Sequence, residues 1–448
     1  MVHNILLLPS ALLLVTVTRA ETFTTLVNLA GGTSAAQPGF NALVQGINGD
    51  FYGASIAGGN TSAKYGAGTI YSVSPQGVLK ILHAFDGKDG ARPTGLMVMP
   101  DGTLYGTATH GGAANWGSVF SITPAGTFKT LHYFDSVDGA NPKAPPVLGF
   151  DGLLYGTAYS GGFSNYGTIY QITTGGTFGL LYALDGGFSY NPEAALIQAS
   201  DGLLYGVTSL PGSIFSISTS GVFSQLYSYS NFAYLVAALV QDTDGNFYGT
   251  TKQGGTNNNG TAFEFTPGGA PTVLYNFYGT AGDLPEGALI QGTDGNFYGT
   301  TAAGGTRSQS GTVFQITPGG TLTTLHSFNG IDGNTPYAGL VQGTDGNFYG
   351  TTGSGGSRNV GTIFRLSMGL GPFVRPLPVF GSPGSIITIL GTNLTGTTSV
   401  TFNGATAAFT VLSPTAIRAT IPSGATTGKI QVVTPDGTLP SNGVFQTL

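Results

Sequence analysis

The chain of 448 residues contains no cysteine. Disulfides, thiolate metal sites, iron–sulfur clusters and thiol catalysis are therefore excluded, and the fold must rest on its core and its backbone hydrogen bonds. Charged residues are also scarce, at 8%, and 14 Lys and Arg against 20 Asp and Glu give a net charge of −6 with no basic run. Because phosphate backbones are bound by clustered Lys and Arg, we expect no nucleic-acid partner.

Glycine and apolar residues are abundant instead. Gly numbers 75 and hydrophobic residues make up 40% of the chain. A disordered protein shows the opposite balance, with few apolar residues and much charge. The composition therefore predicts a folded protein with an uncharged polar surface.

The N-terminus carries a short apolar segment. Residues 5–18 read ILLLPSALLLVTVT, and the small residues Thr18 and Ala20 suit cleavage after Ala20. The alternative, a membrane anchor, requires a longer apolar run. We predict a signal peptide at residues 1–20, a secreted or cell-surface protein, and no transmembrane segment in the mature chain.

A unit of about fifty residues recurs through most of the chain. The nonapeptide TDGNFYGTT occurs at residues 243–251, 293–301 and 344–352, and related Tyr-Gly segments extend the series to seven copies. Its tyrosines are Tyr52, Tyr105, Tyr155, Tyr205, Tyr248, Tyr298 and Tyr349. A motif that returns at this period belongs to a structural building block, and the length suits one blade of a β-propeller.

Each unit reads as four β-rich runs joined by turn residues. Asp-Gly at 294–295 favours a tight hairpin, and Pro-Gly-Gly at 318–320 favours the next tight turn. The neighbouring Phe297 and Tyr298 point to opposite faces of a strand, so both faces must be covered. The pattern predicts an all-β fold, a seven-bladed propeller of four-stranded blades.

The last unit lacks its fourth run, and the N-terminus supplies a match for it. Residues 22–29, TFTTLVNL, align with residues 321–328, TLTTLHSF. We predict that the N-terminal strand completes the seventh blade and closes the ring; an open solenoid is the alternative. The long connections, between strands two and three and between blades, should share one rim, where binding usually occurs.

The repeat resembles a known family. Its DGNFYGTT, GG, GTVFxIT and LHSFNGxDG segments are similar to the Gloeo/Verruco (GloVer) tandem repeat of exported bacterial "choice-of-anchor" proteins, over residues 22–367. The resemblance implies an exported protein and a repeat architecture. It implies no activity, because the family is defined by its repeat.

The C-terminal segment has a different pattern. Short β-rich runs alternate with Gly, Pro and Ser turns, as in a small β-sandwich. ITILGTNL, VTFNG, AIRATIPSG and GKIQVVTPDG resemble the IPT/TIG immunoglobulin-like domain. We therefore divide the chain into the signal peptide (1–20), the propeller (21–368) and an IPT/TIG-like sandwich (369–448).

Few residues qualify as candidate site residues. His83, His132 and His326 share a repeat position with tyrosines, which indicates packing. The Asp-Gly aspartates indicate turn chemistry, and Asp242 lacks the closing acid of a calcium loop. Aromatic residues of the long loops, Tyr65, Trp116 and Tyr166, and the loop residue His110 are the predicted ligand-binding residues, although packing over their own blades is an equal alternative.

These features favour a binding protein that uses the long-loop face to engage an extracellular glycan or a surface protein. We predict no catalytic residues, metal or cofactor, and a monomer. The alternative is an exported polysaccharide-active enzyme, a lyase or hydrolase, with its centre at the propeller mouth. A carboxylate clustered with His or Arg at that mouth would favour the enzyme.

Overall fold

The computed structural model describes residues 21–60, 67–187, 190–209, 211–229, 233–307 and 309–448. The predicted signal peptide at 1–20 lies outside these residues. The described chain is all-β, as predicted, and its one helical element is the 3₁₀ turn η1 (Gly279–Ala281). It contains no helix long and apolar enough to cross a bilayer.

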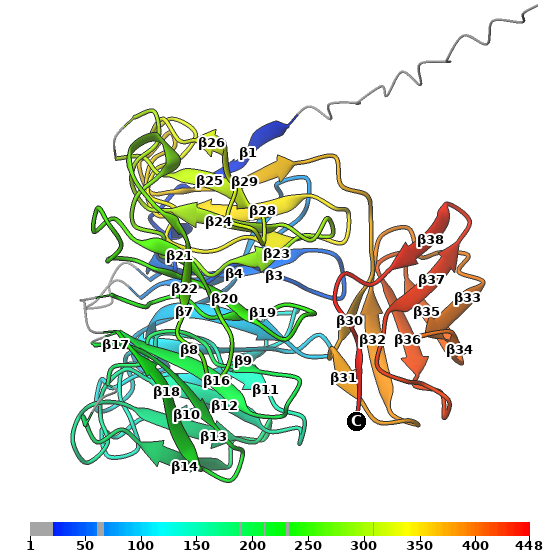
Figure 1. Cartoon of the computed structure of the whole chain (residues 1–448), viewed down its shortest axis with the longest axis horizontal. Helices are drawn as coiled ribbons and strands as arrows, with labels where there is room; N and C mark the ends of the chain where they lie inside the picture. Colours follow the sequence, from blue (N-terminus) through cyan, green and yellow to red (C-terminus); the bar gives the residue numbers. More distant parts are fainter. Residues whose placement is uncertain (1–20, 61–66, 188–189, 210, 230–232, 308) are drawn as a thin grey trace, which may run out of the picture.

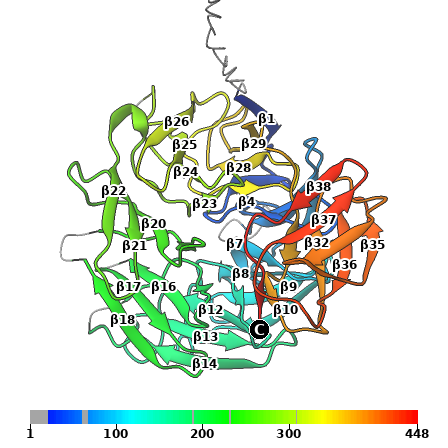
Figure 2. The same cartoon turned by 45° about the vertical axis from the view of Figure 1, so that its right-hand side comes forward.

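Residues 22–367 of the described chain form seven sheets, which we number 1 to 7 in chain order, and Figure 2 shows them around a common centre. The first strands are β3 (Val44–Gln45), β7 (Ala91–Val98), β11 (Val147–Leu148), β15 (Ile197–Gln198), β19 (Val240–Gln241), β23 (Ile290–Gln291) and β27 (Val341–Gln342). The second strands are β4 (Phe51–Gly58), β8 (Leu104–His110), β12 (Leu154–Ala158), β16 (Leu204–Ser209), β20 (Phe247–Thr251), β24 (Phe297–Thr301) and β28 (Phe348–Thr352).

The outer strands complete each sheet. The third strands are β5 (Thr69–Val73), β9 (Ser118–Ile122), β13 (Thr168–Ile172), β17 (Gly212–Ile217), β21 (Thr261–Phe265), β25 (Thr312–Ile316) and β29 (Thr362–Ser367). The fourth strands are β6 (Leu79–Ala84), β10 (Phe128–Tyr133), β14 (Phe178–Ala183), β18 (Phe223–Ser228), β22 (Thr272–Asn276), β26 (Leu322–Ser327) and β1 (Thr22–Asn28). Sheet 1 has an additional strand, β2 (Ala35–Pro38).

Sheet 7 joins the two ends of the repeat region. Strand β1 pairs antiparallel with β29, from Thr22 opposite Ser367 to Asn28 opposite Thr362. Sheet 7 also packs on sheet 1, where the rings of Tyr349 and Phe51 stack with centroids 4.0 Å apart.

The repeated Phe-Tyr-Gly segment supplies the contact between neighbouring sheets. Tyr248 stacks on Phe297 of the next sheet with ring centroids 4.2 Å apart, and Tyr298 packs against the following Phe348 in a tilted arrangement at 4.1 Å. The Tyr and Phe side chains leave opposite faces of each strand, so each sheet offers a tyrosine to one neighbour and a phenylalanine to the other. This contact explains why the motif recurs.

The Asp-Gly aspartates hold the turn between the first two strands. The carboxylate of Asp294 accepts the backbone N–H of Asn296 at 3.2 Å and the hydroxyl of Tyr298 at 2.8 Å. Equivalent Tyr–Asp bonds join Tyr155 to Asp151 and Tyr349 to Asp345. The aspartate of each of these motifs thus accepts a hydrogen bond from the hydroxyl of the tyrosine in the same motif.

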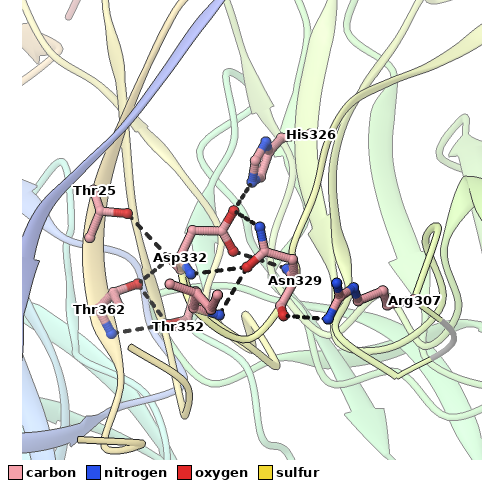
Figure 3. A network of polar contacts seen from close by, with 8 residues as sticks. Thr25, Arg307, His326, Asn329, Asp332, Thr352 and Thr362 are labelled. Carbon is pink, nitrogen blue, oxygen red and sulfur yellow. Dashed lines mark hydrogen bonds and ion pairs between the residues drawn. The ribbon is translucent and has the colours of Figure 1, made fainter. Parts of the chain in front are cut away.

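Three histidine–aspartate pairs fasten the loops that leave the fourth strands. His326 Nε2 lies 3.0 Å from Asp332 Oδ2, and the same carboxylate accepts the N–H groups of Asn329 (Figure 3). His83 with Asp89 and His132 with Asp138 repeat the contact at 2.7 Å. Each ring also stacks on a phenylalanine of the next sheet, namely Phe128, Phe178 or Phe23. These histidines therefore pack between sheets.

The C-terminal segment folds around its own core. One sheet contains β30 (Arg375–Leu377), β32 (Ile386–Leu390), β36 (Ala416–Thr420) and β35 (Phe409–Ser413), and a second contains β34 (Ala405–Thr406), β33 (Ser399–Phe402), β37 (Ile430–Thr434) and β38 (Gly437–Pro440). A short pair joins β31 (Phe380–Gly381) to β39 (Gln446–Thr447). Ile389, Val400, Phe402, Ile417 and Val432 are among the side chains buried between the sheets.

This C-terminal unit lies beside the seven sheets (Figure 1) and contacts their tight turns. Thr388 Oγ1 donates to Pro100 O at 2.7 Å, and Thr415 Oγ1 donates to Ile47 O at 2.9 Å. Further contacts reach sheets 3, 4 and 6 through Phe150, Ser200 and Gln291. The C-terminal unit thus occupies the tight-turn face and leaves the long-loop face uncovered by it.

Candidate functional site

A repeated turn opens the first strand of most sheets. The residue before a proline adopts the left-handed conformation at Gln37, Arg92, Asn141, Asn191, Leu284 and Thr335, with φ between 50° and 60°. Its N–H donates to a carbonyl at the end of the preceding sheet's long loop, as from Asn141 to Trp116 O at 2.8 Å and from Asn191 to Tyr166 O at 2.7 Å. This bond holds the turn against the preceding sheet, so the residue after the proline has a fixed position on the long-loop face.

Four of the six residues that follow these prolines meet at a cavity of about 350 Å³ on the long-loop face. Thr94, Lys143, Glu193 and Glu286 all follow such a proline and all line the cavity. The ends of the second strands contribute Ile56, Thr109, His110 and Lys252, and Phe40, Asn41, Arg92, Tyr234 and Val236 complete the lining. Sheets 1 to 6 each supply at least one of these side chains.

Two ion pairs cross from one sheet to the next at this cavity. Lys143 Nζ of sheet 3 pairs with Glu193 Oε1 of sheet 4, and Lys252 Nζ lies 3.1 Å from Glu286 Oε1. The ammonium of Lys143 also lies 3.4 Å from the ring centroid of Tyr159, within the range of a cation–π interaction. Both carboxylates are largely buried, with side chains 11% exposed. Burial of a charge costs free energy, and the paired lysines provide the main compensation for that cost.

The surroundings shift the pKa of several cavity groups. Burial raises the pKa of Glu286, Lys252 opposes that rise, and the charge of Glu193 adds to it. Burial lowers the pKa of His110, and the nearby charges of Arg92 and Lys143 lower it further. Burial also raises the pKa of Tyr234, and the Glu193 carboxylate contributes to that rise. At neutral pH the cavity therefore holds a neutral imidazole and a neutral phenol among fixed charges.

Three polar groups at the cavity have unused bonding capacity within the described residues. His110 Nδ1 and Glu193 Oε2 are buried and have no hydrogen-bond partner there. None of the ion pairs in the described chain involves Arg92, whose side chain is exposed at the cavity. Buried polar atoms are normally satisfied, so His110 Nδ1 and Glu193 Oε2 are exceptions with room for one hydrogen bond each, and the exposed Arg92 guanidinium has no carboxylate paired with it in the part of the chain that the structure describes.

The predicted site residues fall at different places. His110 lines the cavity. Trp116 and Tyr166 are 40% and 38% exposed on their long loops and are not among the cavity lining. Tyr166 instead contacts the connection between sheets 3 and 4, with its ring centroid 5.3 Å from that of Tyr190. Tyr65 lies outside the described residues. A ligand role for the three aromatics stays a prediction.

The charged cavity residues were not among the site residues predicted from the sequence. A signal was present in the repeat itself. The position after the proline is Lys143, Glu193 or Glu286 in three units, whereas the surrounding turn is kept. In a chain with so few charged residues, charge at a variable position of a turn that six of the seven sheets share marks a surface with its own role.

No set of three His, Asp or Glu side chains in the described chain could hold a metal ion. The cavity's carboxylates are each occupied by a lysine. The arrangement therefore suits recognition of a polar ligand by charge and hydrogen bonds, and it places a neutral histidine beside two cations.

Comparisons with known proteins define the relatives of this chain. The model of the Gloeobacter/Verrucomicrobia repeat matches residues 13–213 and 209–411. A streptogramin B lyase is similar in structure, with 16% identity and a TM-score of 0.55, over 78% of this chain and 97% of that one. A catalytically inactive virginiamycin B lyase from Staphylococcus aureus with quinupristin gives 18% identity and a TM-score of 0.56, over 78% and 99%.

At such low identity the likeness to the two lyases concerns the propeller-like fold alone. No curated protein is significantly similar to the chain. The family model, in contrast, spans most of the sequence, including every copy of the Tyr-Gly motif. The chain belongs to the Gloeobacter/Verrucomicrobia repeat family.

Proposed function

We propose that the chain is an exported binding protein whose ligand site is the cavity on its long-loop face. The observation that carries this proposal is the convergence of Arg92, Lys143, Glu193, Lys252 and Glu286 on one cavity, in a chain of which only 8% is charged. These five charged residues come from five different sheets, numbers 2 to 6, and meet at one place. Cavities of this size, from about 300 Å³, hold small ligands.

The architecture in this proposal is a closed seven-bladed propeller (21–368), followed by an immunoglobulin-like module of the IPT/TIG type (369–448). The pairing of β1 with β29 and the stacking of Tyr349 on Phe51 support closure. The module contacts the tight-turn face, so the cavity side faces the medium. The apolar residues 5–18 support export.

A cavity-filling variant tests the site even while the ligand is unidentified. Small polar compounds would be screened against the mature chain by ligand-observed NMR. Val236→Trp should abolish binding of the compounds found, because Val236 lines the cavity. Val222→Trp is the matched control, since Val222 is 68% exposed on a tight turn. Compounds that still bind Val236→Trp with unchanged affinity would contradict the proposed site.

A second candidate, catalysis on an extracellular polysaccharide, is favoured by the presence of His110 and Arg92 in the same cavity as the Glu193 carboxylate, which is the kind of cluster expected of an enzyme. A neutral imidazole with a free nitrogen, next to Arg92 and Lys143, is a suitable general base. His110→Gln should then abolish release of new chain ends from a polysaccharide substrate and weaken binding by no more than about tenfold, the contribution of one hydrogen bond. Equal release by both proteins would show that His110 is not the general base, whereas absence of release from every polysaccharide tested would leave binding as the function.

A further inference from the structure

The unused bonding capacity of the cavity defines the chemistry of its ligand. Glu193 Oε2 is a buried acceptor without a partner, and His110 Nδ1 is an acceptor when the neutral ring carries its proton on Nε2. Arg92 is a cation without a carboxylate partner in the described chain. A complementary ligand therefore has hydrogen-bond donors for Glu193 and His110 and one negative charge for Arg92.

The charge count limits the ligand to a single negative charge. Three cations, Arg92, Lys143 and Lys252, face two carboxylates, Glu193 and Glu286, which leaves one positive charge when His110 is neutral. A phosphate dianion exceeds this capacity. An ammonium group is also disfavoured, because each carboxylate already has a lysine partner. Neutral hydroxyl donors satisfy Glu193 Oε2 without adding charge.

The wall of the cavity provides an apolar surface beside the polar groups. Phe40 lines the cavity, is 48% exposed, and lies with its ring centroid 5.3 Å from that of Tyr337. Aromatic faces of this kind pack on the C–H face of a sugar ring. The volume of about 350 Å³ limits the occupant to the end of a saccharide chain.

We propose that the cavity binds a sugar acid, the uronate residue at the end of an acidic saccharide, with its carboxylate on Arg92 and its hydroxyls on Glu193 and His110. This inference rests on the proposed function and specifies its ligand class. Arg92 distinguishes uronate from neutral sugar, and the two acceptors distinguish a polyhydroxylated acid from a simple carboxylic acid.

Calorimetric titration tests the inference with trigalacturonate and the neutral galactose trimer. Trigalacturonate should bind at least about tenfold more tightly, a preference that one charge-assisted contact provides. Arg92→Gln should remove the preference, and Arg92→Lys should keep part of it. Arg307→Gln is the matched control, because Arg307 is an exposed arginine on a long loop of sheet 6 that does not line the cavity. It should leave the preference unchanged.

The outcomes separate this inference from the proposed function. Equal binding of the two trimers, with no effect of Arg92→Gln, would overturn the sugar-acid assignment while a cavity site remains. Binding of an acidic peptide in preference to both trimers would also overturn it. If neither trimer binds while the NMR compounds still depend on Val236, the assignment fails and the cavity site stands. If no compound depends on Val236, the site itself is wrong.

Discussion

The imidazole of His326 stacks on the ring of Phe23, with centroids 3.6 Å apart and planes 4° from parallel. These residues lie about three hundred positions apart in the chain, on the fourth strands of sheets 6 and 7. Phe23 also contacts Phe328 and Phe364. The first strand of the described chain is thus packed on the sheet before it as well as paired with β29.

Deletion of residues 21–30 should destabilise the protein and promote its aggregation. The change removes β1, so β29 becomes an edge strand with unpaired backbone groups. We expect a clear fall in melting temperature, measured by circular dichroism, and larger species in light scattering. Phe23→Ala should cost about 3 kcal/mol through loss of the ring contacts alone. A truncated chain as stable as the intact one would contradict closure by β1.

Stability should depend on pH through His326. Burial lowers the pKa of His326 below its usual 6.5, although Asp332 opposes the effect. The unfolded chain therefore takes up the proton first, and stability falls as pH drops from 6.5 through the folded pKa. One such group changes the free energy of unfolding by at most about 1.4 kcal/mol per pH unit.

His326→Tyr should remove this contribution to the pH dependence while keeping the packing, because Tyr182, Tyr227 and Tyr275 occupy the same position in other sheets. Tyr182 stacks on Phe223 at 4.6 Å in the same manner. Urea denaturation of both proteins between pH 5 and 8 would measure the difference. An unchanged slope in the variant would show that His326 is not the titrating group.

The ion pair at the cavity should show strong coupling in a double-mutant cycle. Lys143→Met leaves the Glu193 carboxylate, 11% exposed, without its partner. Removal of one partner of a buried pair costs about 3–5 kcal/mol, and the 33% exposure of Lys143 reduces this to about 1–3. Lys143→Met with Glu193→Met should lose less than the sum of the two single variants. Additive losses would mean that the pair does not stabilise the fold.

The repeat made much of the fold predictable, because the same order of β-rich runs and turn residues occurs in each unit. The Asp-Gly turns, the strand order and the alignment of residues 22–29 with a fourth strand all match observed elements. The cavity was harder to predict, since its residues come from different sheets and are brought together only by the shared centre. His110 was predicted from its place beside Gly111 and Gly112, and it lines the cavity, but its ligand role stays a prediction. Arg92 lies in a turn and gave no such signal.

Residues 372–448 should fold without the seven repeat sheets. The C-terminal unit has its own buried core, which includes Ile389, Phe402, Ile417 and Val432. Its contacts with the tight turns are mainly side-chain hydrogen bonds to backbone carbonyls, such as Thr388 to Pro100. The fragment should show a cooperative thermal transition by circular dichroism. A fragment that lacks such a transition would mean that the tight-turn face is part of its core.

Trp116 and Tyr166 should respond differently to truncation, although they occupy equivalent places in sheets 2 and 3. The backbone carbonyl of each accepts the N–H of a left-handed asparagine, a bond that alanine keeps. Tyr166 also packs on Tyr190, so Tyr166→Ala should lower the melting temperature. Trp116, 40% exposed, has no ring contact among those found in the described chain, so Trp116→Ala should melt normally.

Retention on immobilised extracellular polysaccharides then tests whether the rim extends the cavity site. Truncation of an aromatic side chain that is a main contact for a ligand reduces the binding free energy by about 2 kcal/mol or more. Weaker retention of Trp116→Ala at an unchanged melting temperature would show that the ligand reaches from the cavity to the rim of sheet 2. Equal retention of Trp116→Ala, together with loss in Arg92→Gln, would restrict recognition to the cavity. An early melting transition in Trp116→Ala would instead assign the indole to packing, as for Tyr166.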